Sequence, residues 1–297
     1  MRVFVTGGTG YIGSALIPEL VAAGHTVLGL ARSEEASDTL RGLGAEAHRG
    51  DLGDISSLRE GAQASDAVVH LAYNHDFSQM SSAGEVDRAA LSAFAEEYAG
   101  TSRPIVGASG ILGLPRDREV TEVDVHEAYD WLPPRDRAER LSKQFAETHG
   151  VMSSVVRLAP TVHGTSDWGF ITTYVQTARD RGTAAYVGDG TQTWPAVHRS
   201  DAATLFRLAI EKPVAGEVLH GTAENVAMRD LADAVATKLG VSVSSIPAER
   251  ATDHFGAVGH FFTLSAVASS AWTRTRFGWE PSGPSLLQDI ASGAYTD

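Results

Sequence analysis

Three glycines, spaced three residues apart, follow the first apolar run of the chain. The run covers residues 3–5, and Gly7, Gly10 and Gly13 stand directly behind it. Such glycines let the backbone turn tightly, approach a phosphate closely and begin a helix packed on the strand, and the helix N-terminus offers free N–H donors to an anion. The spacing predicts a binding loop for the pyrophosphate of a dinucleotide. The alternative is an ordinary turn between a strand and a helix.

A basic residue and a hydroxyl follow the second expected strand, residues 26–31. They are Arg32 and Ser33, and the first carboxylate comes only at Glu34. A protein that prefers NAD places an acidic residue here for the ribose 2′-hydroxyl, whereas a guanidinium can bind a 2′-phosphate with two hydrogen bonds. The pair predicts NADP(H) as the cofactor, with a solvated surface arginine as the alternative.

Polar residues also follow the fourth expected strand, residues 67–72. Tyr73, Asn74 and His75 come there in succession. Because the carboxyl ends of parallel strands face the ligand in open α/β sheets, we predict that these residues contact the substrate, as does Trp194 farther along the chain. The alternatives are a loop of polar caps and, for Trp194, a structural anchor.

The elements that would position these residues alternate between strand and helix. Apolar runs predict strands, and apolar residues at helical spacing predict the helices between them, at residues 3–5, 12–23, 26–31, 34–43, 45–48, 56–62, 67–72, 79–99, 104–108, 137–149 and 154–158. This order predicts an α/β fold with a doubly wound parallel sheet. We expect a dinucleotide-binding domain over residues 1–159. Residues 160–297 form mainly a smaller substrate lobe, with residues 196–222 returning to the sheet.

Composition narrows the classes of partner. The chain has 297 residues, a net charge of −13 and no cysteine. Nucleic acids and anionic membranes attract basic surfaces, so neither is expected as a partner, and no apolar run approaches the roughly 18 residues of a membrane span. The histidines show no metal-ligand spacing, so no metal is predicted. With only Met1 and Arg2 before the first strand, we expect a cytoplasmic protein without a leader.

Several short motifs together resemble the extended or atypical short-chain dehydrogenases/reductases. The resemblance spans nearly the whole chain and rests on residues 6–13, 50–52, 70–72, 108–110, 141–143, 197–201 and 277–281. It implies a Rossmann fold, NAD(P) as cofactor and a C-terminal substrate lobe. The sequence leaves open whether the protein forms a homodimer.

The resemblance also implies roles for single residues. Lys143 matches the catalytic lysine that also binds the cofactor ribose, and Ser109 matches the catalytic serine; their alternatives are a lysine on a helix surface and a serine in a turn. His163 stands where relatives often carry a tyrosine, so it is a candidate proton donor. Asp51 matches the aspartate that contacts adenine, with helix capping as its alternative. The resemblance further implies cofactor contacts for Thr6, Gly7, Gly10, Tyr11, Ile12, Gly13, Leu52, Leu71 and Ala72.

One position departs from the family pattern. The family has a tyrosine four residues before the lysine, whereas Glu139 stands four residues before Lys143. A carboxyl group, with an ordinary pKa near 4.3, is no simple replacement for a phenol whose pKa is near 10. This departure favours the atypical branch, which lacks the tyrosine.

These observations predict an NADPH-dependent oxidoreductase that reduces a small carbonyl, imine or conjugated substrate such as a quinone or enone. A sugar-nucleotide epimerase or dehydratase is the first alternative, and Glu139 counts against it. A non-enzymatic NADP(H)-sensing module is the second, with Ser109 and Lys143 counting against it.

Overall fold

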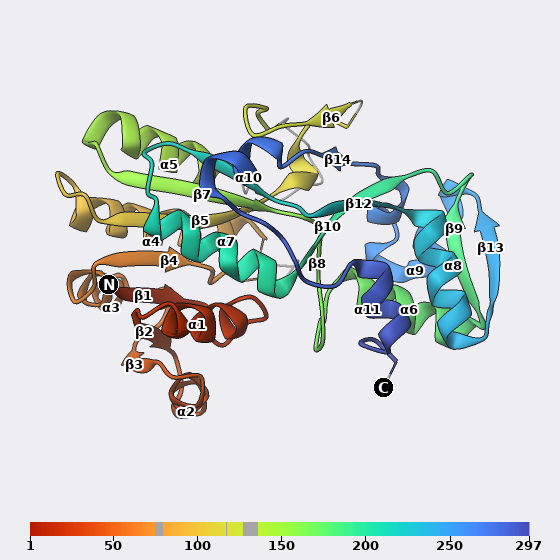
Figure 1. Cartoon of the computed structure of the whole chain (residues 1–297), viewed down its shortest axis with the longest axis horizontal. Coiled ribbons are helices and arrows are strands. Elements are labelled where there is room, and N and C mark those ends of the chain that lie inside the picture. The colour runs from red at the N-terminus through yellow and green to blue at the C-terminus, as the bar shows by residue number, and fades with distance from the viewer. Residues whose placement is uncertain (75–79, 117, 127–135, 297) are drawn as a thin grey trace.

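A parallel sheet of seven strands forms the larger part of the molecule (Figure 1). The computed structural model describes residues 1–74, 80–116, 118–126 and 136–296. In spatial order the strands are β11 (Val218–Gly221), β7 (Met152–Leu158), β5 (Pro104–Gly110), β4 (Ala67–His70), β1 (Arg2–Thr6), β2 (Thr26–Ala31) and β3 (Glu46–Arg49). The predicted doubly wound α/β fold is confirmed, and its carboxyl edge is where ligands bind in such sheets.

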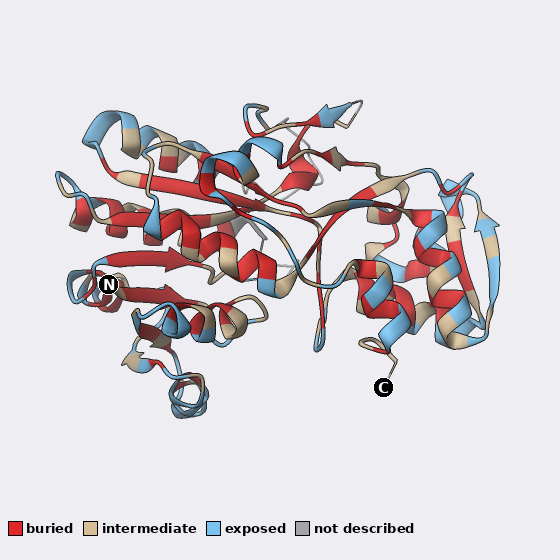
Figure 2. Ribbon diagram, in the orientation of Figure 1, coloured by how far each residue is buried: buried red, intermediate tan, exposed pale blue. Residues whose placement is uncertain are grey.

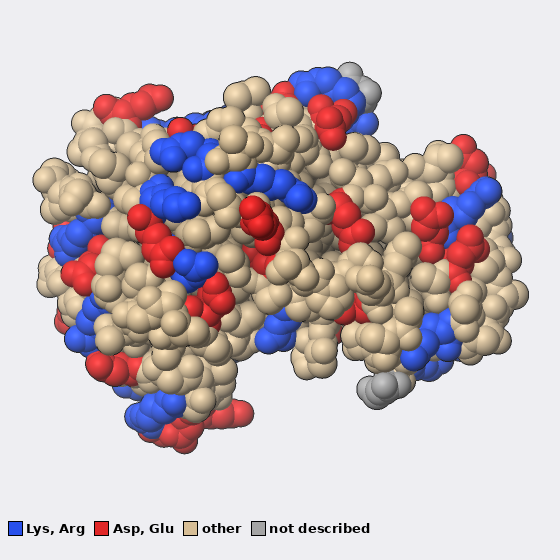
Figure 3. Space-filling model, viewed as in Figure 1, with Lys and Arg blue, Asp and Glu red and all other residues tan. Residues whose placement is uncertain are grey.

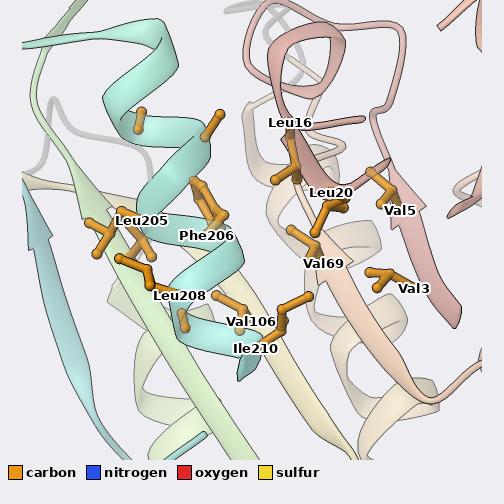
Figure 4. Close-up of a cluster of buried hydrophobic side chains, with 14 of the residues drawn as sticks. Val3, Val5, Leu16, Leu20, Val69, Val106, Leu205, Phe206, Leu208 and Ile210 are labelled. Carbon is orange, nitrogen blue, oxygen red and sulfur yellow. The ribbon is translucent and has the colours of Figure 1, made fainter. Parts of the chain in front are cut away.

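Helices cover both faces of this sheet. On one face lie α1 (Gly13–Ala22), α2 (Glu34–Gly42) and α7 (Arg199–Glu211), and on the other α3 (Ile55–Gln63), α4 (Met80–Tyr98) and α5 (Asp136–His149). Successive residues of a strand point to opposite faces, so Val3 and Val5 join the core under α1 and α7 (Figure 4) while Phe4 joins the core under α3 and α4. Burial on both faces explains why the strands read as continuous apolar runs.

The rest of the chain builds a separate lobe beside the sheet (Figure 1). Its small sheets have the orders β12-β10-β8 and β13-β9. The strands are β8 (Thr161–His163), β9 (Thr183–Val187), β10 (Thr193–His198), β12 (Glu224–Ala227) and β13 (Ser242–Ile246), and the helices are α6 (Phe170–Arg181), α8 (Met228–Leu239), α9 (Ala251–Phe255) and α11 (Leu286–Ser292). Aromatic rings fill the lobe core, where Trp194 stacks on Phe262 at 5.2 Å between ring centroids.

The chain returns from the lobe to the sheet in two segments. The first comprises α7 and β11, and the second is α10 (Ala271–Phe277), which follows the pairing of β14 (Val267–Ala268) with β6 (Glu119–Val120). Phe277 and Trp279 are buried in the core under α1 and α7, and the Trp279 indole N–H donates to the carbonyl of Asp201 at 3.0 Å. This aromatic segment therefore completes the core of the sheet.

The surface carries charges of both signs. On the face shown in Figure 3, basic and acidic side chains lie interspersed, and Figure 2 shows that the strands inside are buried almost throughout. Within the described ranges, no helix has the length and apolar character needed to span a membrane.

Candidate functional site

The glycine loop between β1 and α1 has no room for side chains at two of its glycines. A Cβ on Gly13 would lie 2.1 Å from the carbonyl oxygen of Gly7, and one on Gly7, whose φ is +72°, would lie 2.7 Å from the amide nitrogen of Ala72. Helix α1 has no side-chain cap and no acidic residue in its first turn, whereas Ser33 caps α2 and Asp54 caps α3. The close-packed loop and a helix N-terminus that carries no acidic side chain fit a bound pyrophosphate.

A hydrogen-bonded chain joins the loop to the end of β4. The Thr6 hydroxyl lies 2.7 Å from Nδ1 of His70 and accepts from the Ala72 amide at 3.2 Å, while Nε2 of His70 lies 3.1 Å from Asp87 on α4. The structure thus brings Thr6, the glycines and the segment Leu71–Ala72 together. Ile12 is the residue that precedes the first turn of α1.

The residues expected around the adenine end lie after β2 and β3. Arg32 is exposed, and the hydroxyl of Ser33 accepts from the Ala36 amide at 3.1 Å as it caps α2. Asp51 is exposed and accepts from the Gly53 amide at 2.9 Å, so it is not the cap of α3, which is Asp54. Leu52, the neighbour of Asp51, packs at the edge of the core under α3 and α4.

Ser109 stands at the carboxyl end of β5 on the face covered by α4 and α5. In the sheet register it pairs with Arg157 of β7, which is the neighbour of His220 on β11. The Ser109 side chain is fully buried, and its hydroxyl has no hydrogen-bond partner among the described residues. A buried hydroxyl without a partner is costly, and a bound ligand would satisfy it.

Glu139 lies in a buried ionic cluster beside Ser109. Its carboxylate accepts from Nε and Nη2 of Arg157 at 2.8 and 2.5 Å and from Nε2 of His126 at 3.2 Å, and Nζ of Lys143 lies 3.5 Å away. Burial by itself raises the pKa of Glu139, but the hydrogen bonds and charges of His126 and Arg157 outweigh it and lower the pKa to about 2. The carboxylate therefore stays ionised at neutral pH and is no proton donor there.

Arg157 is the residue of this cluster that sequence reasoning missed. Its side chain is fully buried, and it also donates to the carbonyls of Glu122 and Asp124, at 3.4 and 2.7 Å. A signal was present, because an arginine inside the apolar run of residues 155–158 requires a buried partner. The sequence did not say which partner.

His163 is held in a second buried pair, between β8 and α11. Its Nδ1 lies 2.6 Å from Oδ2 of Asp289, and its ring meets that of His198 edge-on at 5.5 Å. Burial lowers the pKa of His163 below its ordinary value, against the opposing hydrogen bond and charge of Asp289. With its side chain buried and its Nδ1 bound to Asp289, His163 is placed as a link between lobe elements, and its proposed role as proton donor stays a prediction.

Tyr11 connects the glycine loop to this part of the lobe. The guanidinium of Arg199 lies 5.0 Å from the centre of its ring, and burial, with a smaller contribution from the charge of Asp167, raises the pKa of its phenol. Tyr295 near the C-terminus donates to Asp167 at 3.1 Å and accepts from the Gly164 amide at 3.3 Å. The loop after β8 is thereby fastened to the C-terminal segment.

The predicted substrate residues are not gathered in one place. Tyr73 and Asn74 follow β4 at the carboxyl edge, and His75 lies outside the described residues. Trp194 is 1% exposed and its indole N–H donates to the Leu264 carbonyl at 3.1 Å. The structure places it in the lobe core, which fits the alternative of a structural anchor, and its contact with substrate stays a prediction.

Comparison with known proteins relates the whole chain to two yeast proteins. A model of the NAD-dependent epimerase/dehydratase family matches residues 3–94. An uncharacterized protein of Schizosaccharomyces pombe is 39% identical over 99% of this chain and 100% of its own length, and one of Saccharomyces cerevisiae is 39% identical over 98% of each. The decarboxylating sterol-4-alpha-carboxylate 3-dehydrogenase of Dictyostelium discoideum is 26% identical over 82% of this chain and 78% of its own length.

Solved structures share the fold at low identity. The UDP-glucose 4-epimerase of Thermotoga maritima superposes with a TM-score of 0.78 at 19% identity, covering 99% of this chain and 98% of the epimerase. The dTDP-glucose 4,6-dehydratase of Streptomyces venezuelae, solved with NAD, gives 0.78 at 20% identity, covering 99% and 96%. The family match and the two yeast relatives show that the chain belongs to the NAD-dependent epimerase/dehydratase family of extended short-chain dehydrogenases/reductases.

Proposed function

We propose that this protein is an NADPH-dependent oxidoreductase that reduces a small carbonyl, imine or conjugated substrate. The observation that carries the proposal is the buried hydroxyl of Ser109, which has no hydrogen-bond partner in the described part of the chain and lies at the same sheet edge as the phosphate-fitting glycine loop. A ligand that fills both places would run from the loop after β1 to the end of β5. That path suits a dinucleotide whose nicotinamide end lies at Ser109.

The nicotinamide cofactor supplies the hydride chemistry when bound, and the chain supplies orientation. The loop at Gly7 and Gly13 would hold the pyrophosphate, and Lys143 would hold the nicotinamide ribose. Ser109 would donate a hydrogen bond to the substrate oxygen or nitrogen. Because the low pKa of Glu139 keeps it ionised, the proton would reach the substrate from Ser109, from His163, from the polar residues after β4 or from water.

The preference for NADPH rests on Arg32. Its guanidinium is exposed after β2, and Arg49, also exposed, follows on the neighbouring strand, where it pairs in register with Ala31. Two guanidinium groups at adjacent strand ends favour a 2′-phosphate over a 2′-hydroxyl.

Titration of both cofactors by fluorescence tests this preference. We expect tighter binding of NADPH than of NADH, and we expect Arg32→Ala to weaken NADPH binding by about 1.5–3 kcal/mol while it leaves NADH binding nearly unchanged. Arg250→Ala, which removes an exposed arginine of the lobe, is the control. Equal affinities of the unaltered protein for the two cofactors would contradict the preference.

Turnover separates the reductase from its alternatives. A reductase consumes one NADPH per product, as read from nicotinamide absorbance over a panel of carbonyl, imine and quinone substrates. Turnover of a sugar nucleotide with no net change in absorbance would instead establish an epimerase or dehydratase. Cofactor binding without any turnover would favour a sensing module.

A further inference from the structure

The carboxylate of Glu139 occupies the place in the fold where the resemblance expects a tyrosine. It lies on α5 one turn before Lys143, and its two oxygens are shared among Arg157, His126 and Lys143. The side chain is 5% exposed, so these partners replace solvent around it. The contacts fix the carboxylate in one position.

Arg157 and Lys143, two of the basic partners of this carboxylate, differ in conformational freedom. Arg157 is fully buried, with hydrogen bonds to Glu139, to two carbonyls and to Nε2 of His220 at 3.3 Å. The Lys143 side chain is 35% exposed, and its Nζ lies 3.5 Å from Oε1 of Glu139. A lysine side chain loses much rotamer freedom when its ammonium group binds a ligand. A rigid carboxylate one helical turn away already restricts the side chain, so less conformational entropy is lost on binding.

We propose that Glu139 is a positioning residue, which fixes the ammonium group of Lys143 at the carboxyl edge of the sheet and is itself anchored by Arg157. Glu139 then acts through Lys143 and does not exchange a proton with the substrate. This inference rests on the proposed function, because Lys143 is taken to hold the nicotinamide half of the cofactor.

The affinities of the Glu139→Gln variant for two different ligands test the inference. NADPH spans the whole site, whereas adenosine 2′,5′-bisphosphate carries only the adenine half and cannot reach Lys143. We expect NADPH to bind about fivefold more weakly and the bisphosphate to bind as before. Lys143→Ala should weaken NADPH about tenfold, and adding Glu139→Gln to it should weaken binding no further. Glu147→Gln, an exposed change on the same helix, is the control.

A second variant guards against misfolding, because Glu139→Gln leaves the buried charge of Arg157 without its counter-ion. Replacing both residues by methionine removes the pair together, and such replacements are often tolerated. We expect Glu139→Met with Arg157→Met to melt near the unaltered protein and to show the same selective loss of NADPH binding.

Each other outcome overturns the inference. NADPH binding unchanged in Glu139→Gln, equal weakening of both ligands, or an additive loss in the double variant with Lys143→Ala would show that Glu139 does not act through Lys143. Unchanged binding with slower single-turnover transfer would make Glu139 a catalytic residue. If the unaltered protein binds neither NADPH nor NADH, the proposed function fails first.

Discussion

Two buried acid–base pairs join distant elements, and they differ in the chemistry of their basic partner. Glu139 and Arg157 link α5 to β7 in the sheet half, while Asp289 and His163 link α11 to β8 in the lobe. An arginine is charged at every pH at which the protein folds. The histidine is buried, and burial lowers its pKa. The first is therefore a permanent ion pair, and the second is a carboxylate hydrogen-bonded to a neutral ring.

This difference indicates how each half of the molecule responds to its surroundings. The ion pair constrains the sheet edge throughout the neutral range, because the pKa of Glu139 is lowered to about 2. The histidine ring can gain a proton as the pH falls, so the charge of the second pair changes with pH. Measurements of the unfolding free energy of variants, and of its dependence on pH, can confirm or contradict this difference between the two pairs.

The largest effect is expected from Arg157→Ala. It leaves the carboxylate of Glu139 buried without its main partner, which costs about 3–5 kcal/mol of unfolding free energy. Denaturant unfolding measures the loss, with Arg250→Ala as a surface control. A loss below about 1 kcal/mol would mean that the ion pair is dispensable to the fold.

A smaller effect is expected from Asp289→Ala. It removes the acceptor of His163 Nδ1 and leaves a neutral buried donor unsatisfied, at a cost of about 1–3 kcal/mol. Asp233→Ala, on the exposed side of α8, is the matched control. A loss as large as that of Arg157→Ala would indicate that His163 is charged in the folded protein.

The smallest effect is expected in the pH dependence of stability. Since the folded pKa of His163 is lowered from 6.5, the unfolded chain gains a proton there that the folded chain does not, and stability falls as pH falls below 6.5. The pKa of Glu139 falls from 4.5 to about 2, so its contribution is complete above pH 4.5 and is lost between those values.

Variants assign each of these pH windows to its residue. We expect His163→Gln to flatten the slope just below pH 6.5, although His220 and His254, whose pKa values burial also lowers, keep part of it. We expect Glu139→Gln to flatten only the slope below pH 4.5. Curves that remain parallel to that of the unaltered protein would contradict the assignment.

The sheet half could be predicted from the sequence because its signals are local. Apolar runs such as residues 67–70 mark strands buried on both faces, and the glycine loop marks the first turn, so the fold class and most elements up to β7 are confirmed. The lobe strands gave no comparable signal. β13 has the sequence Ser-Val-Ser-Ser-Ile and is largely exposed, so it shows no buried face.

The sequence predicted the residues of the candidate site only where they belong to a short motif. The residues of the glycine loop and the ends of β1 and β4 do lie together, but their contacts with a cofactor stay predictions. The partner of Arg157 depends on how α5 packs on β7, and Asp289 stands 126 residues from His163. Such pairings follow from tertiary packing, which no local pattern encodes.

The two return segments of the chain affect how the protein is made. During synthesis from the N-terminus, Val3, Val69 and Val106 emerge long before α7, which covers them (Figure 4). They also emerge before Trp279, which completes the same core. A nascent chain that ends at residue 159 lacks both, and also the edge strand β11. We therefore expect the nucleotide-binding half to complete its core only after the lobe and the two return segments have been synthesised.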